Sequence, residues 1–211
     1  MIDVLFISPG NSSGIYQNLA NSYAAIEPPT WALLLAQSCR SIGHTVNLID
    51  INAEQLDKEE VVNRIKNINP RLICFVVYGQ NVNSGTVNMS GAVYISNYLK
   101  EIGIITPICY AGSYVQAVPI KALKEEPSID FAFTNEGVYA LRNILALDNI
   151  DTTNLANIKG IAWRKDGIPT INPAEKIVPN ELMDIDLPGY AWDLLPMKEK
   201  PLDLYRAPMW H

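Results

Sequence analysis

Apolar runs and amphipathic stretches alternate along the first 150 residues. Five short runs are almost continuously apolar, as expected of strands covered on both faces. They span residues 2–8, 45–51, 71–77, 105–110 and 129–133. Each is followed by a segment whose apolar residues recur every three or four positions, the spacing of a helix with one buried face. These segments lie near residues 29–42, 61–68, 91–102, 120–125 and 138–145.

Five strands, each followed by a helix, predict an α/β fold with a doubly wound, five-stranded parallel sheet. We expect the flavodoxin-like strand order 2-1-3-4-5. In such sheets ligands bind beyond the carboxyl ends of the strands, at the switch point between strands one and three. The segments at that edge are residues 9–23, 78–86, 111–118 and 134–137.

The pattern changes after residue 150. Residues 158–172 contain two short apolar runs separated by Asp166-Gly167, which predicts a β-hairpin. Residues 173–211 are rich in proline and acidic residues and show no period, so we interpret them as an extended arm that needs something to pack against. The sequence therefore divides into a sheet domain, residues 1–150, and a hairpin with an arm, residues 151–211.

Charge and composition exclude several partners. The net charge is −6, and the sixteen basic residues form no run, which argues against a nucleic-acid partner. No apolar stretch is long enough to span a bilayer, and Met1-Ile2-Asp3 lacks the basic start of a signal peptide. We therefore expect a cytoplasmic protein without a membrane partner.

Cysteine and histidine spacing predicts neither a metal site nor a catalytic cluster. Cys39, Cys74 and Cys109 lie too far apart for a local metal or disulfide motif, so we expect buried, inert thiols. His44 begins the second predicted strand, at the wrong end for a ligand site, and is interpreted as a capping or surface residue. The other histidine, His211, is terminal. No catalytic residue is predicted.

Two carboxylates lie at the carboxyl ends of predicted strands. Asp50 follows the second strand and can equally cap the next helix. Glu136 follows the fifth strand, either as a site residue or as a first-turn residue favoured by the helix dipole.

The strand-end loops are neutral and rich in hydrogen-bonding groups. "PGNSSGIYQN", "YGQNVNSGT" and "AGSYVQA" contain Gly, Ser, Asn, Gln and Tyr but no Lys or Arg. Neither GxGxxG nor the Walker pattern is present. The loops suit a large, neutral, amide-rich ligand, and the alternative is that they are ordinary polar surface loops.

Five stretches resemble, in the correct order, the cobalamin-binding domains of radical S-adenosylmethionine (SAM) enzymes. "EPPTWALLLAQSCRSIGHTVNLIDINAE" is similar to that family's proline pair, helix, Gly-His, strand and Asp. "AGSYVQAVPIKAL" and "IDFAFTNEGVYALRNIL" are similar to its Gly-Gly-Pro-His and Gly-Glu-Gly-Glu segments. "IKGIAWRKDGIPTINP" and "DIDLPGYAWDLLP" resemble its hairpin and linker. The resemblance covers nearly the whole chain.

The resemblance implies cobalamin over the strand ends, with the nucleotide tail between sheet and helices. The resemblance implies no histidine ligand to cobalt, because the loop after the first strand contains no histidine. The residues implied to hold cobalamin are Pro9, Gly10, Asn11, Ser12, Tyr16, Pro28, Pro29, Thr30, Tyr78, Gly79, Gln80, Asn81, Gly112, Ser113, Tyr114, Val115, Asn135, Glu136 and Gly137. Among them, Gly79 and Gly112 are expected to allow close passage of the tail.

The family also implies parts that this sequence does not contain. Its next segment is a barrel with a CxxxCxxC motif that holds a [4Fe–4S] cluster and uses SAM, most often in a methyltransferase. The arm is then expected to lead onto that barrel, and the present chain alone is not expected to be catalytic. Two departures stand out: Ala111-Gly112-Ser113-Tyr114 replaces Gly-Gly-Pro-His, and Asn135-Glu136-Gly137-Val138 replaces Gly-Glu-Gly-Glu. The alternatives are a cofactor-free docking or substrate-presenting domain and a flavodoxin-like electron carrier.

Overall fold

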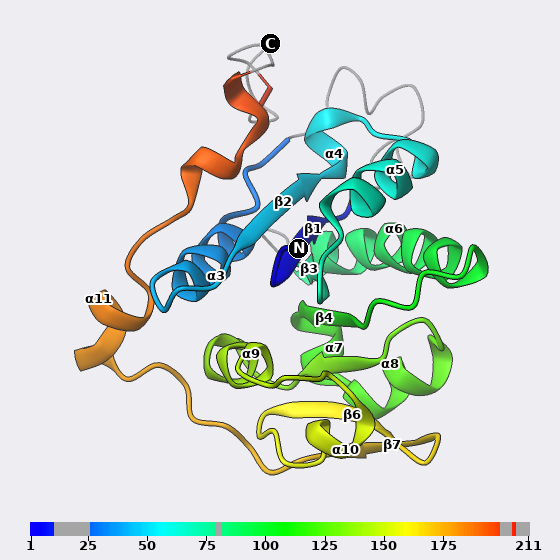
Figure 1. Cartoon of the computed structure of the whole chain (residues 1–211), viewed down its shortest axis with the longest axis vertical. Coiled ribbons are helices and arrows are strands. Elements are labelled where there is room, and N and C mark those ends of the chain that lie inside the picture. Colours follow the sequence, from blue (N-terminus) through cyan, green and yellow to red (C-terminus); the bar gives the residue numbers. More distant parts are fainter. Residues whose placement is uncertain (11–25, 79–81, 199–203, 206–211) are drawn as a thin grey trace.

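Seven strands of the described residues form one mixed sheet in a computed structural model of the chain (Figure 1). The structure describes residues 1–10, 26–78, 82–198 and 204–205, with the backbone alone at 82–87. The strand order is β2-β1-β3-β4-β5-β6-β7. The strands are β1 (Val4–Ser8), β2 (Val46–Asp50), β3 (Ile73–Val77), β4 (Ile108–Gly112), β5 (Phe131–Phe133), β6 (Ile161–Lys165) and β7 (Ile168–Ile171).

The expectation of a five-stranded, wholly parallel sheet needs correction. Strands β1 to β5 pair in parallel, but β6 pairs antiparallel with β5, with Phe131 opposite Trp163 and Phe133 opposite Ile161. The hairpin therefore extends the sheet, because its apolar run covers the free edge of β5 and becomes buried there. The predicted Asp166-Gly167 turn is confirmed, since both residues have positive φ, as the tight hairpin turn requires.

Helices cover both faces of the sheet, as a doubly wound fold requires. One face packs against α3 (Thr30–Arg40), α9 (Val138–Leu145) and α10 (Thr152–Leu155). The other packs against α4 (Ile51–Glu54), α5 (Lys58–Ile68), α6 (Val82–Glu101), α7 (Ser113–Ala117) and α8 (Pro119–Glu125). Among the helices that the structure describes, none combines the length and apolar character needed to cross a bilayer.

Several element boundaries differ from the predicted ones, and those of β4 and α6 have a clear reason in the sequence. β4 begins at Ile108 and not at Ile105, which is 92% exposed, because Pro107 precedes the strand and the buried run continues to Gly112. α6 begins at Val82, nine residues before the predicted helix at Gly91. Its first turns are rich in Asn, Ser and Thr, which favour caps and turns and so obscure a helical pattern.

The arm packs on the α3 and α9 face of its own domain (Figure 1, orange). It contains η1 (Asn180–Leu182), α11 (Met183–Asp186), η2 (Trp192–Leu194) and η3 (Pro196–Lys198). Val178, Ala191 and Leu195 are buried, and the Ala191 N–H donates to the carbonyl of Leu33 at 3.2 Å. Part of the arm therefore packs on its own domain, while Ile177, Ile185 and Trp192 remain at least half exposed.

Charged side chains fasten the arm. The Arg142 guanidinium lies 2.6 Å from a carboxylate oxygen of Asp186, and the Tyr139 hydroxyl donates to the same carboxylate at 2.5 Å. Hydrogen bonding from Tyr139 and the nearby Arg142 charge hold the pKa of Asp186 below its usual value. A second pair, Arg40 with Asp193 at 2.8 Å, is more exposed.

Candidate functional site

The carboxyl ends of the parallel strands carry most of the predicted ligand residues. The described ones are Pro9 and Gly10 after β1, Pro28 to Thr30 at the start of α3, Tyr78 after β3, Gly112 to Val115 after β4, and Asn135 to Gly137 after β5. Six others, namely Asn11, Ser12, Tyr16, Gly79, Gln80 and Asn81, lie outside the described residues.

Two glycines let the chain pass close to itself at this edge. A Cβ on Gly112 would lie 2.4 Å from the carbonyl oxygen of Val77, and one on Gly10 would lie 2.5 Å from the Cβ of Asn52. Both distances are far below van der Waals contact. The described structure therefore gives these glycines a backbone-packing role in addition to the ligand role expected from the sequence.

An aromatic pair connects α3 to the end of β3. The rings of Trp31 and Tyr78 meet edge to face with centroids 5.7 Å apart. The Trp31 indole N–H donates to the carbonyl of Glu136 at 3.2 Å, and the Tyr78 carbonyl accepts a bond from the Asn88 amide at 3.1 Å. The pair thus fixes the start of α3 against the β5–α9 loop.

Gln116 on α7 completes this group. Its side-chain nitrogen donates to the Tyr78 hydroxyl and, at 2.5 Å, to the carbonyl of Asn135. Trp31, Tyr78, Gln116 and Asn135 are termed the edge cluster below. It joins segments that follow β3, β4 and β5, and none of its side chains is ionised at neutral pH, since burial raises the pKa of Tyr78 to about 12.

The β5–α9 loop is also bonded to the arm. The Asn135 side chain accepts from the Gly137 N–H at 3.0 Å and donates to the carbonyl of Glu175 at 3.1 Å. The Glu136 carboxylate accepts from the Val178 N–H at 2.5 Å. Glu136 therefore directs its carboxylate to the arm, and α9 begins only at Val138, so Glu136 is not a first-turn residue of that helix.

The other predicted residues lie apart from the edge cluster. Thr30 begins α3 and Pro29 is its N-cap, so the helix begins one residue after the predicted start at residue 29. The Tyr114 hydroxyl donates to Glu125 of α8 at 3.2 Å, and Val115 is buried in the core of the opposite face.

Sequence reasoning missed Trp31 and Gln116. Trp31 directly follows the selected Thr30, and Gln116 lies inside the selected segment 111–118, one helical turn after Ser113, but neither was chosen as a ligand residue. Since α7 was not predicted as a helix, the i, i+3 spacing that brings Gln116 to this edge was not apparent.

Asp50 is a buried carboxylate at the same edge, 2% exposed, at the end of β2. It accepts from the Ala53 N–H at 3.2 Å and from the Tyr205 hydroxyl at 3.0 Å. The prediction that it caps the next helix is confirmed. Burial raises the pKa of Asp50 to about 6, although the hydrogen bonds from Ala53, Tyr205 and Ser8 act in the opposite direction.

This raised pKa predicts a pH-dependent stability. Between about pH 4 and pH 6, Asp50 keeps its proton in the folded chain. In the unfolded chain, where its pKa is near 3.8, Asp50 has lost that proton. The contribution of Asp50 to the free energy of unfolding is therefore greatest at low pH and decreases by up to about 3 kcal/mol as the pH rises through this window.

An Asp50→Asn variant lacks the titration and keeps an acceptor for Tyr205. Its stability relative to wild type, from urea unfolding at pH 4.5 and 7.5, is expected to rise with pH; an unchanged difference contradicts the assignment.

His44 and the three cysteines lie where the sequence predicted, while His211 is outside the described residues. His44 is at the amino-end edge of the sheet, with Nδ1 3.8 Å from a carboxylate oxygen of Asp3. Cys39, Cys74 and Cys109 are free and buried, and burial raises the thiol pKa of Cys39 and of Cys109.

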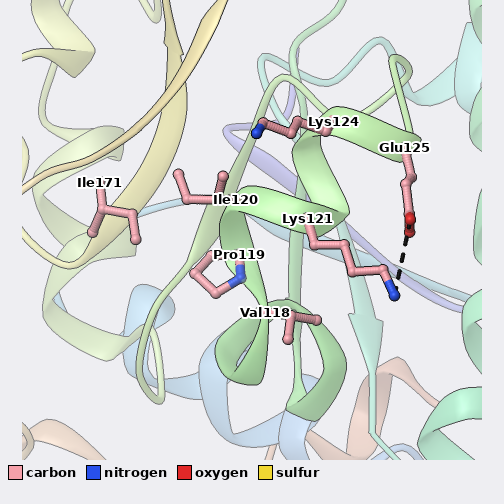
Figure 2. A pocket seen from close by; sticks show the side chains of 7 residues that line it. All are labelled: Val118, Pro119, Ile120, Lys121, Lys124, Glu125 and Ile171. Carbon is pink, nitrogen blue, oxygen red and sulfur yellow. Dashed lines mark ion pairs between the residues drawn. The ribbon is translucent and has the colours of Figure 1, made fainter.

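An open pocket of about 470 Å³ lies away from the edge cluster, between α8 and β7 (Figure 2). Apolar side chains of Pro119, Ile120 and Ile171 face it, and Lys121 pairs with Glu125 at 3.9 Å on its rim. None of the residues predicted for the ligand lines this pocket, so it is not the candidate site.

The edge cluster fits a neutral, amide-bearing ligand. Its side chains are an indole, a phenol and two amides, which add no charge, although the Trp31 N–H and the Gln116 NH₂ are already engaged within the chain. Neutral donors on rigid strand ends orient a bound ligand more than they attract it electrostatically.

The sequence also matches a known family of domains. A family model described as the B12 binding domain matches residues 17–145, more than half of the chain. No curated protein matches the sequence.

Solved structures with the same fold are large enzymes. The cobalamin-dependent SAM radical enzyme OxsB, with aqua-cobalamin and SAM bound, is 15% identical at a TM-score of 0.64, over 89% of this chain and 24% of its own. The radical SAM methyltransferase TsrM from Kitasatospora setae, with tryptophan substrate and a SAM analogue bound, is 18% identical at a TM-score of 0.60, over 82% of this chain and 30% of its own. The present chain thus spans about a quarter to a third of the length of these proteins.

Proposed function

This chain belongs to the family of B12-binding domains, and from that premise we propose that it holds cobalamin at the carboxyl edge of its sheet as one part of a cobalamin-dependent radical SAM enzyme. The family match over residues 17–145 carries the proposal. The neutral edge cluster supports it, because the cofactor carries many amide groups. The residues proposed to hold it are those of the edge cluster and the described residues of the neighbouring loops.

The proposed binding mode leaves cobalt without a histidine. The loop after β1 contains none by sequence, and His44 lies at the opposite edge. We therefore propose that cobalamin would bind base-off and without a histidine, and that neutral side chains of the loops after β1 and β3, such as Asn11, Tyr16 or Gln80, would be the candidates to hold it there. When bound, cobalamin supplies the capacity to accept and donate a methyl group, and we propose methyl transfer, the activity named for TsrM, as the reaction of the full enzyme.

This domain's share of the chemistry is binding and orientation. The rings of Trp31 and Tyr78, with the amides of Gln116 and Asn135, form a rigid donor and acceptor set beside the strand ends. Reductive cleavage of SAM requires a [4Fe–4S] cluster, and the thiols here are three buried, separated cysteines. We propose that the cluster and SAM belong to a radical SAM barrel elsewhere in the full enzyme, so that this domain alone does not turn over.

Reconstitution tests the proposal. The purified chain is mixed with hydroxocobalamin and desalted, and its visible spectrum is recorded. About one equivalent of retained cobalamin is expected, and the His44→Ala variant is expected to retain as much with the same spectrum. A colourless wild type after reconstitution overturns the proposal and favours a cofactor-free docking domain, whereas a yellow protein as isolated favours a flavin carrier.

A further inference from the structure

The hydroxyl group of Tyr78 is in an unusual hydrogen-bonding position. It lies beside the side-chain nitrogen of Gln116, and in the part of the chain that the structure describes it donates to no acceptor. Its ring is held by the edge-to-face contact with Trp31, and its backbone carbonyl by Asn88. The position of the hydroxyl group is therefore fixed by its surroundings.

The chemistry of Asn135 fixes the direction of the bond to Tyr78. The backbone carbonyl of Asn135 can only accept, so the Gln116 group that faces it at 2.5 Å must be the NH₂ and not the carbonyl oxygen. The same nitrogen contacts the Tyr78 hydroxyl. An amide nitrogen does not accept hydrogen bonds, so Tyr78 accepts from Gln116 and its own proton must point elsewhere.

We propose that Gln116 is a positioning residue that makes the Tyr78 hydroxyl a hydrogen-bond donor to an oxygen atom of the bound cofactor. This inference rests on the proposed function, since it assigns a role within the same site. The oxygen belongs either to a ring amide or to the phosphate-containing tail. Because burial raises the pKa of Tyr78, the hydroxyl keeps its proton at neutral pH and remains a donor.

Three variants separate direction from packing. Tyr78→Phe deletes the hydroxyl donor. Gln116→Glu replaces the NH₂ by a carboxylate oxygen, which accepts from Tyr78 and so reverses the bond. Gln116→Leu deletes both polar groups of the Gln116 side chain. Each is expected to weaken hydroxocobalamin binding about tenfold, measured by absorbance titration. The Tyr78→Phe/Gln116→Glu double variant is expected to be no weaker than either single one, because both remove the same donor.

Acidification and a truncated ligand sharpen the test. As the introduced carboxyl group of Gln116→Glu is protonated, it regains a donor, so its affinity is expected to recover relative to wild type, whereas Gln116→Leu does not recover. Cobinamide keeps the ring amides and lacks the tail. If the variants lose as much affinity for cobinamide as for cobalamin, the acceptor oxygen is on the ring. If they lose affinity for cobalamin alone, it is on the tail.

Two controls keep the outcome clear. Gln37→Glu adds the same charge on α3, six residues after Trp31, and is expected to bind as wild type does. Urea unfolding without cobalamin shows whether each variant is folded. Wild-type binding by Tyr78→Phe, additive losses, or equal weakness of Gln116→Glu and Gln116→Leu at low pH would overturn the inference. A wild type that binds no cobalamin contradicts the proposed function instead.

Discussion

Replacing Arg142 by methionine is expected to lower the free energy of unfolding by about 2–3 kcal/mol and to loosen the arm. The side chains of Arg142 and Asp186 are 11% and 13% exposed. Arg142 also donates to the buried Ser38, to its hydroxyl at 3.0 Å and its carbonyl at 3.1 Å. Methionine fills the volume but removes the Arg142 donors from Ser38 and from the Asp186 carboxylate, which keeps its bond from Tyr139, and this loss is costly away from water.

The matched control is Arg40→Met. Its partner Asp193 is 60% exposed, so this variant is expected to lose at most about 1 kcal/mol. Urea unfolding followed by tryptophan fluorescence measures both changes. Tryptic cleavage after Lys176, whose ammonium lies 4.7 Å from the Tyr139 ring, measures arm release. Equal effects of the two substitutions would show that the Arg142 pair does not fasten the arm.

Gly112→Ala is expected to destabilise the fold by about 3 kcal/mol. The added Cβ would lie 2.4 Å from the Val77 carbonyl oxygen, a backbone atom of the neighbouring strand that cannot turn aside. The backbone of Gly112 is extended, so the cost is steric and comes from separating β3 and β4. The variant is also expected to bind cobalamin more weakly, because Tyr78 and Gln116 follow these two strand ends.

Gly103→Ala provides the comparison. Gly103 has φ +81° with nothing within 4 Å of an added Cβ, so the change measures left-handed strain alone, about 1 kcal/mol. The free energy of unfolding from urea titration gives both values. If Gly112→Ala costs no more than Gly103→Ala, the strands separate easily and the glycine has no packing role.

The arm and the edge cluster are connected through one loop. Asn135 receives a bond from Gln116 and donates to Glu175, while Glu136 accepts from Trp31 and from Val178. Release of the arm in the Arg142 variant should therefore reach the proposed ligand edge. Because of these bonds Asn135 and Glu136, which were selected from the sequence as ligand residues, are already hydrogen-bonded within the chain.

The sequence by itself determined the periodic part of the molecule. Alternating apolar runs and helical spacing placed all five parallel strands, the five longer helices of the sheet domain and the Asp166-Gly167 turn, because each of these depends on local burial and backbone preference. The neutral character of the strand-end loops and the burial of the thiols could also be read from neighbouring residues. So could the capping role of Asp50, as one of two alternatives.

Only the tertiary structure decided how distant segments meet. That the hairpin completes the sheet depends on the free edge of β5, and that the arm docks on α3 and α9 depends on Arg142 and Asp186 meeting across 44 residues. The direction of the Tyr78–Gln116 bond depends on a carbonyl from a third loop. Such contacts leave no local period in the sequence, because their energy comes from groups brought together only after the sheet has formed.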